Sequence, residues 1–418
     1  MQPARRLSMP EFIALMGMMF ATVAFSIDAM LPAMGEIADE LSPDAPNRAQ
    51  LIITSFVLGM GLGTLLTGPL SDSFGRKTVI LCGAALYIFA AILAWAAPTL
   101  EFVLLARVLQ GLGAAGPRVA ALAIVRDLYE GRRMAQVMSF AMLVFTLVPA
   151  IAPLMGAGII WLAGWRGIFV AFVLFAVLTN LWLGLRQPET LAPENRRPFR
   201  VSTIASGIAE VFALRQVVLT MAALSLAFGV LFTTLSTTQQ VFDLSFDAAD
   251  SFPYWFAVIA LLSGTGSLLN ARIVIRLGMR RVVRLTFATQ LALSALMALI
   301  TAGGADGPLF FALYVGWTTT IFFMAGLTIG NLNALGMEPL GHLAGLAASI
   351  IGSVATVAAV LIAVPIGLAF DGTPLPLALG SAICCALGIR LMHVLGPGEA
   401  EAAAGPGLAK PSADAPAD

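Results

Sequence analysis

The chain has 418 residues, of which 59% are hydrophobic and 11% charged, and its mean hydropathy is +0.93. A soluble domain carries about 25% charged residues, so this composition excludes a soluble protein and indicates an integral membrane protein. The formal net charge is zero, which leaves no basic surface for nucleic acid. The three cysteines lie in apolar runs, two of them adjacent, and indicate neither a disulfide framework nor a zinc site.

Twelve apolar runs are long enough to cross a bilayer, which requires roughly 20 residues. We expect spans at 12–34, 50–71, 78–97, 102–125, 134–161 and 164–185, and then at 217–238, 252–271, 282–302, 308–336, 344–370 and 375–394. The first run is too long for a cleavable signal peptide and lacks a small-residue cleavage site, so we interpret it as a retained span. The predicted fold is therefore all-α, with twelve transmembrane helices.

A segment rich in Arg, Pro and Glu divides the spans into two groups of six. We expect a cytoplasmic N-terminus at 1–11, an N-terminal six-helix bundle at 12–185, a cytoplasmic linker at 186–216, a C-terminal six-helix bundle at 217–395 and a disordered cytoplasmic tail at 396–418.

The distribution of cations predicts the orientation. An even number of spans puts both termini on one side, and if that side is the cytoplasm, nineteen Lys and Arg residues lie there. Only Arg48 and Arg166 fall on the outer side. This asymmetry is the excess of cytoplasmic cations typical of membrane proteins.

The first cytoplasmic turn, at 68–77, joins two apolar runs. Gly75 permits a tight turn, and Arg76 and Lys77 supply cations that hold it in the cytoplasm. Asp72 lies near the carbonyl end of the preceding helix, which repels an anion, so we expect its partner outside that helix. The alternative is a polar loop with a solvated acid.

A similar turn follows the eighth span, where Gly278 corresponds to Gly75 at an offset of 203 residues. The same offset carries the start of the first span onto Arg215, close to the start of the seventh. The halves are therefore weak parallel repeats, as in transporters built from two rocking bundles. Ile275 stands where a second copy of Asp72 would fall.

Four stretches resemble the major facilitator superfamily. The turn GPLSDSFGRK, which begins at Gly68, is similar to that superfamily's G-x-L-x-D-x-x-G-R-K signature. The stretch RVLQGLG, which begins at Arg107, is similar to the R-x-x-Q-G-x-G element linked to proton coupling. Asp28, four residues before Pro32, resembles the D-x-x-x-P-type element of drug exporters.

The fourth stretch, PAIAPLMG at 149–156, resembles the G-P-x-x-G antiporter element through Pro149, Pro153 and Gly156, with Ala152 in place of the first Gly. Shorter stretches at 123–129, 165–169 and 345–349 look like the bicyclomycin- and chloramphenicol-resistance branch. The resemblance implies two six-helix bundles related by pseudo-two-fold symmetry, in the inner membrane of a bacterium. It also implies a monomer that uses the proton as coupling ion and needs no other cofactor.

The resemblance further implies that the first turn is a latch between bundles, formed by Gly68, Asp72, Gly75, Arg76, Lys77 and Asp127. Asp72 would face the amino end of the eleventh helix, expected at 341–346, where an anion is stabilised. Arg76 would pair with Asp127. The alternative is a generic surface ion pair, which contributes little.

Two ionisable residues lie inside the membrane at similar depth. Asp28 is six residues from the outer end of its span and Arg107 six residues from the outer end of the fourth, so both lie roughly 9 Å below the boundary. Burial raises the pKa of a carboxyl group and a nearby cation lowers it, so such an acid can exchange a proton. Our hypothesis is that Asp28 carries the proton and Arg107 is its counter-charge. The alternative is a static ion pair between the two helices.

Arg118 lies eleven residues after Arg107, on the same helix face. It either faces water or a polar or anionic substrate group, or reaches the cytoplasmic mouth. We expect the substrate cavity to include Arg118, Phe25, Thr234, Gln239 and Asn331. Alternatively, the hydroxyls only join helix to helix, and the aromatic rings only contact lipid or neighbouring helices.

We expect an exporter that exchanges protons for small, mostly apolar compounds by alternating access between the two bundles. The alternative is an exporter of a native metabolite such as an amino acid or peptide. A membrane enzyme would need a nucleophile paired with a base, or a metal cluster, at one depth, which this sequence does not suggest. A channel fits the repeats and the buried charges less well than a carrier does.

Overall fold

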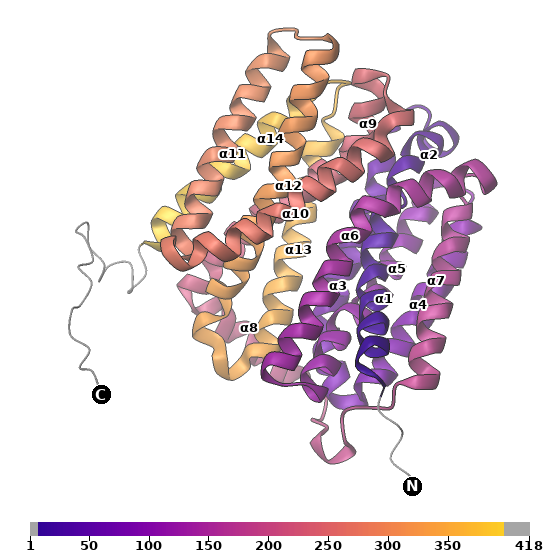
Figure 1. The fold of residues 1–418 in the computed structure, drawn as a ribbon, viewed down its shortest axis with the longest axis vertical. Helices are drawn as coiled ribbons and strands as arrows, with labels where there is room; N and C mark the ends of the chain where they lie inside the picture. Colours follow the sequence, from indigo (N-terminus) through magenta and orange to yellow (C-terminus); the bar gives the residue numbers. More distant parts are fainter. Residues whose placement is uncertain (1–6, 397–418) are drawn as a thin grey trace.

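The computed structural model describes residues 7–396, in which all regular secondary structure is helical (Figure 1). Most of the predicted tail and the first six residues of the predicted cytoplasmic N-terminus lie outside the described residues.

Twelve of the described helices have 20 or more residues, which confirms the predicted all-α fold of twelve long helices. They are α1 (Met9–Asp28), α3 (Leu51–Phe74), α4 (Arg76–Trp95), α5 (Leu100–Leu128), α6 (Gly131–Ala163), α7 (Gly167–Arg186), α9 (Arg215–Phe246), α10 (Phe252–Leu277), α11 (Met279–Ala302), α12 (Gly307–Met337), α13 (Ala344–Leu368) and α14 (Leu375–Leu395).

Ten stretches of the described chain are long and apolar enough to cross a membrane. The longest, the 62-residue Gly307–Leu368, contains both α12 and α13. Helix α6 contributes a shorter apolar part, Leu147–Ala163. These three observations account for all twelve long helices.

The first span differs from the prediction of a single helix over 12–34. Helix α1 ends at Asp28, a 3-10 turn η1 (Leu31–Ala33) follows, and a short helix α2 (Met34–Leu41) completes the segment. Pro32 explains the break, because it has no N–H to bond the carbonyl of Asp28 and its ring clashes with that carbonyl. Asp28 therefore lies in the last turn of a helix rather than inside one.

The linker also contains a helix that the sequence analysis did not predict, α8 (Val201–Ala213). Its buried residues, Ile204, Gly207 and Val211, recur at helical spacing. A Cβ added to Gly207 would lie 2.5 Å from Leu346, so α8 packs closely on α13.

The two halves follow the 203-residue offset. Adding it to the bounds of α4 gives 279–298, beside Met279–Ala302 for α11, and the same shift carries α3 onto α10 and α6 onto α13. The main contacts between the halves are α3 with α13 and α6 with α10. Each of these pairs is the image of the other under the offset, as a pseudo-two-fold axis between the bundles requires. In Figure 1 the indigo-to-magenta helices form one bundle and the orange-to-yellow helices the other.

Helices α3 and α13 run antiparallel and touch along their length through small residues. A Cβ added to Gly61 would lie 3.1 Å from Thr356, and one added to Gly68 would lie 2.7 Å from the Oγ of Ser349. At the other end a Cβ on Gly367 would overlap the side chain of Gln50. Small residues let helix backbones approach closely, which supplies much of helix association in membranes.

Candidate coupling site and inter-bundle cavity

Asp28 is buried, with 5% of its surface exposed, and forms no hydrogen bond or ion pair among the described residues. It lies eleven residues after Gly17, about three helical turns, so the two share a face of α1. That face meets α6, because a Cβ on Gly17 would lie 3.1 Å from Val144. The carboxyl group therefore lies on the side of α1 that faces α6.

Arg107 is fully buried on α5 and binds uncharged acceptors. Its Nη2 donates to the carbonyl of Ser26 at 2.9 Å, its Nε to the carbonyl of Ile52 at 3.2 Å, and its Nη1 to Gln110 Oε1 at 2.7 Å. The guanidinium also lies 4.4 Å from the ring centroid of Phe56.

The predicted contact between Asp28 and Arg107 is absent from this structure. Two residues along a helix correspond to about 200° of rotation, so the bond to Ser26 places Arg107 on the side of α1 opposite Asp28. Equal depth was necessary for the pair but did not determine the direction of each side chain. In this conformation Asp28 and Arg107 therefore form neither the proton-carrying pair of our hypothesis nor the static ion pair of the alternative.

The predicted antiporter element, at 149–156 in α6, lies beside Asp28. A Cβ added to Gly156 would lie 2.2 Å from the carbonyl oxygen of Ala29, so only glycine permits this approach of α6 to α1. Pro149 and Pro153 lie inside the same helix, one half-buried and the other buried. The structure thus brings the predicted antiporter element next to the buried acid.

The Gly75 turn is held by a network of charges. Gly75 has φ of 102°, a conformation that side chains rarely adopt. Arg76 binds Asp72 through Nη1, and its Nε lies 3.2 Å from Asp127 Oδ2, which is the ion pair that the resemblance implies. Lys77 Nζ donates to the carbonyl of Gly184 at 2.7 Å.

Glu189, at the start of the linker, was not predicted as part of this network. Its carboxylate accepts hydrogen bonds from the backbone N–H groups of Arg76 and Lys77 at 2.9 and 3.1 Å. These are the first two residues of α4, so Glu189 supplies the anion that a helix amino end favours. The sequence did contain a signal for this role: Glu189 follows the sixth span closely, on the same predicted side of the membrane as the Gly75 turn.

Asp72 has its partner in α4, outside its own helix, and it shares a cavity with the first turns of α13. The cavity has a volume of about 410 Å³ and lies between the halves. The following residues line it: Thr64, Gly68, Pro69, Ser71, Asp72, Arg76, Arg118, Val119, Leu122, Ala123, Arg126, Asp127, Asn333, Gly345, Leu346, Ala348, Ser349 and Gly352.

Of the five residues predicted to line the substrate cavity, Arg118 lines this one. Phe25 instead packs on Phe172, with ring centroids 5.4 Å apart, and the Thr234 hydroxyl donates to the carbonyl four residues earlier. Gln239 is buried away from the cavity, 3.7 Å from a Cβ built on Gly35.

Asn331 does not line the cavity either, and its amide donates to Asn270 Oδ1 at 2.8 Å. Asn333 lines the cavity in its place. Two residues apart on α12, the two asparagines face opposite sides of the helix, so composition and depth did not distinguish them.

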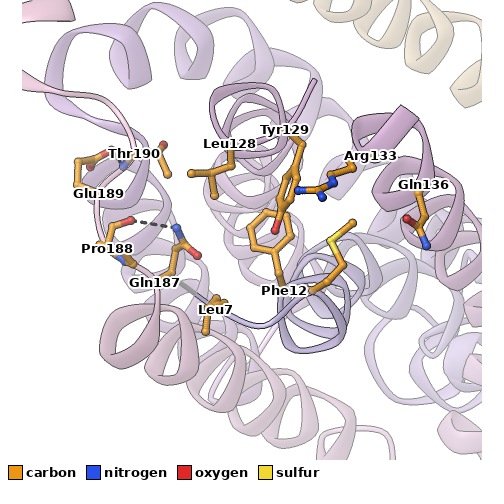
Figure 2. A pocket seen from close by; sticks show the side chains of 11 residues that line it. Leu7, Phe12, Leu128, Tyr129, Arg133, Gln136, Gln187, Pro188, Glu189 and Thr190 are labelled. Atoms are coloured by element: carbon orange, nitrogen blue, oxygen red, sulfur yellow. Dashed lines mark hydrogen bonds between the residues drawn. The ribbon is translucent and has the colours of Figure 1, made fainter. Parts of the chain in front are cut away.

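A larger cavity, about 670 Å³, lies within the N-terminal half (Figure 2). Figure 2 shows Phe12 beside Tyr129, with Arg133 and Gln136 to one side and Gln187–Thr190 to the other. None of the predicted substrate residues lines it. The inter-bundle cavity is therefore the better candidate for substrate.

Comparisons with known proteins agree with this architecture. The family model described as Major Facilitator Superfamily matches residues 13–363. The bicyclomycin resistance protein homolog of Haemophilus influenzae is 32% identical over 346 residues, which cover 82% of this chain and 85% of that protein. A chloramphenicol resistance protein of Pseudomonas aeruginosa is 33% identical over 187 residues, 44% of each chain.

Among solved structures, a D-xylose-proton symporter superposes with a TM-score of 0.71 at 14% identity, over 92% of this chain and 97% of that one. At that identity the likeness concerns the fold alone. The family match and the relatives together show what kind of protein this is. The chain belongs to the Major Facilitator Superfamily, in the branch of the bicyclomycin- and chloramphenicol-resistance proteins, and is a multi-pass membrane transporter rather than an enzyme.

Proposed function

We propose that the protein is an exporter of small, mostly apolar compounds, drugs among them, that exchanges each for protons across the inner membrane of a bacterium. Its relatives are named for resistance to bicyclomycin and chloramphenicol, which supports drug efflux. The excess of cations at the Gly75 side supports an orientation with both termini in the cytoplasm. One chain supplies both bundles, so a monomer suffices.

The observation that carries proton coupling is Asp28, a buried carboxyl group that has no partner among the described residues and lies on the side of α1 that faces α6. An ionised carboxylate in such a place is costly, so Asp28 holds a proton in this conformation. Rearrangement of α1 and α6 would expose it to water and release the proton. Substrate binding would favour the deprotonated form, so protons and substrate would exchange.

Arg107 acts in this proposal by positioning α1 rather than as a direct counter-charge. Its bond to Ser26 ties α5 to α1 two residues before Asp28, and its bond to Ile52 ties α5 to α3. A shift of α1 that frees Asp28 therefore has to change these bonds.

A native metabolite such as an amino acid or peptide is the second candidate substrate. The presence of Arg118 in the cavity favours it, because these compounds carry a carboxylate that a guanidinium binds.

The test is transport by the full chain in reconstituted vesicles with an imposed pH gradient. A panel would contain bicyclomycin, chloramphenicol, free amino acids and dipeptides. We expect saturable movement of at least one compound against the proton flow, abolished by a protonophore. A panel member that moves at the same rate with and without the gradient, without saturation, would indicate a channel and contradict the proposal.

A further inference from the structure

We propose that Arg118 is a binding site for the carboxylate group of an organic-anion substrate whose apolar body fills the inter-bundle cavity. The proposal deepens the export function above and rests on it for the direction of transport. It does not depend on how transport is driven.

The position of Arg118 is deep rather than peripheral. Helix α5 has 29 residues, and Arg118 lies four residues beyond its midpoint, about 6 Å along the axis. Thr64 and Gly352, near the middle of α3 and α13, line the same part of the cavity. Arg126 and Asp127 lie two turns further along α5, towards the Gly75 end. The guanidinium is thus near mid-membrane, where a charge is costly and usually functional.

Among the described residues, both acids of the cavity pair with Arg76 and leave Arg118 without a counter-ion. Arg76 is bound by both Asp72 and Asp127, and Asp127 also accepts from the Thr190 hydroxyl at 2.9 Å. The hydrogen bond of Arg118 among the described residues goes to the sulfur of Met60 at 3.7 Å, a weak acceptor. A guanidinium has five N–H donors, so most of its capacity is open to a ligand.

Apolar side chains line the part of the cavity next to Arg118 in the sequence and part of its α13 wall, and these can hold an apolar body. Val119 and Leu122 flank Arg118 on α5, and Leu346 and Ala348 face them from α13. The volume of about 410 Å³ is within the range of small-molecule sites. A carboxylate suits a guanidinium because two parallel hydrogen bonds form at once, which an ammonium group does not reproduce.

The experiment measures binding of two matched probes, 4-phenylbutyrate and its amide 4-phenylbutyramide, to the purified full chain in nanodiscs, without a pH gradient. The probes share one apolar body and differ in the carboxylate. Hydrogen bonds to a charged group contribute about 1.5–3 kcal/mol, so we expect the wild-type protein to prefer the carboxylate by roughly tenfold to a hundredfold.

Arg118→Gln should remove this preference, and Arg118→Lys should retain only part of it. Arg132→Gln is the matched control, since it removes an exposed cation on α6 that lines neither cavity, and should keep the preference. Size-exclusion profiles and thermal unfolding establish that each variant is folded.

Four outcomes would overturn the proposal: no binding of 4-phenylbutyrate to the wild-type protein, equal binding of the two probes, an unchanged preference in Arg118→Gln, or an equal loss in Arg132→Gln. The last would indicate a general electrostatic field. Because no gradient is applied, failure of proton coupling leaves this result standing, and failure of carboxylate binding leaves proton-driven export of neutral compounds standing.

Discussion

Two residues determine where Asp28 lies, one close in the chain and one close only in space. Pro32 ends α1 at the acid, and the glycine at position 156 lets α6 approach the residue that follows it. The carboxyl group is therefore buried at the end of a helix, beside a break in the span, where a small rearrangement of the backbone can change its exposure to water.

Replacement of Asp28 by Asn tests its role. The amide has nearly the same shape but exchanges no proton, so we expect pH-driven transport to be abolished with the fold intact. The measurement is uptake into vesicles with an imposed gradient, with Asp28→Glu as a control that restores a titratable group. Unaltered proton coupling in the Asn variant would remove Asp28 from the mechanism.

Arg107→Lys separates the two roles considered for the arginine. A counter-charge needs only a cation, whereas the observed bonds to Ser26, Ile52 and Gln110 need the guanidinium fork. Hydrogen bonds to charged groups are each worth about 1.5–3 kcal/mol, so the loss of even one should clearly lower the melting temperature. A variant that melts with the wild-type protein would argue for the counter-charge instead.

At the scale of elements, α3 has two glycine faces. Gly59 and Gly63 meet α5 within the N-terminal bundle, where a Cβ on Gly59 would lie 2.0 Å from the carbonyl oxygen of Val108. Gly61 and Gly68 meet α13 across the bundle interface. One face of α3 therefore packs within its own bundle, in a contact with α5 that we call the fixed seam. The other face packs on α13 of the opposite bundle.

Gly59→Ala should damage the fixed seam. The added methyl group overlaps a backbone carbonyl that cannot move without shifting α5, so we expect a loss of at least about 1–3 kcal/mol, the usual cost of overpacking. Gly158→Ala on α6 is the matched control, because nothing lies within 4 Å of its added Cβ. Equal folded yields and melting temperatures for the two variants would contradict this account of the seam.

For the whole molecule, the interface between α3 and α13 is the place where alternating access can be stopped. A Cβ on Gly68 would lie 3.7 Å from the Cβ of Ser349, close to the 3.8 Å mean of disulfides. In a background without Cys82, Cys384 and Cys385, we expect the Gly68→Cys, Ser349→Cys double variant to crosslink under mild oxidation.

The crosslink should stop transport, and a reductant should restore it, because the proposed cycle requires these helix ends to separate. Mass spectrometry identifies the bond, and each single-cysteine variant is the control. Full transport by the crosslinked protein would show that the cycle does not open the bundles here.

The sequence was sufficient for the twelve helices, the repeat and the family, because hydropathy and the 203-residue offset are properties of whole segments. It was insufficient for the direction of single side chains. The bond from Arg107 to Ser26 shows that Arg107 reaches the end of α1 where Asp28 lies, but the two-residue step from Ser26 to Asp28 puts the acid on the opposite face. For the same reason, Asn331 was predicted in the cavity that Asn333 lines. Helix α8 was missed because charged and proline-rich neighbours masked a short apolar repeat.

The linker has a mechanical consequence for the cycle. Its first part is tied to the N-terminal bundle by Glu189 and by the backbone N–H of Arg197, which donates to the carbonyl of Asp72 at 3.0 Å. Its last part, α8, lies on α13 of the other bundle. The four residue steps from Arg197 to Val201 span at most about 14 Å when stretched. The segment is thus a short tether between the bundles. At this end the bundles can separate only by the length of the tether, unless the contacts of Arg197 or of α8 break.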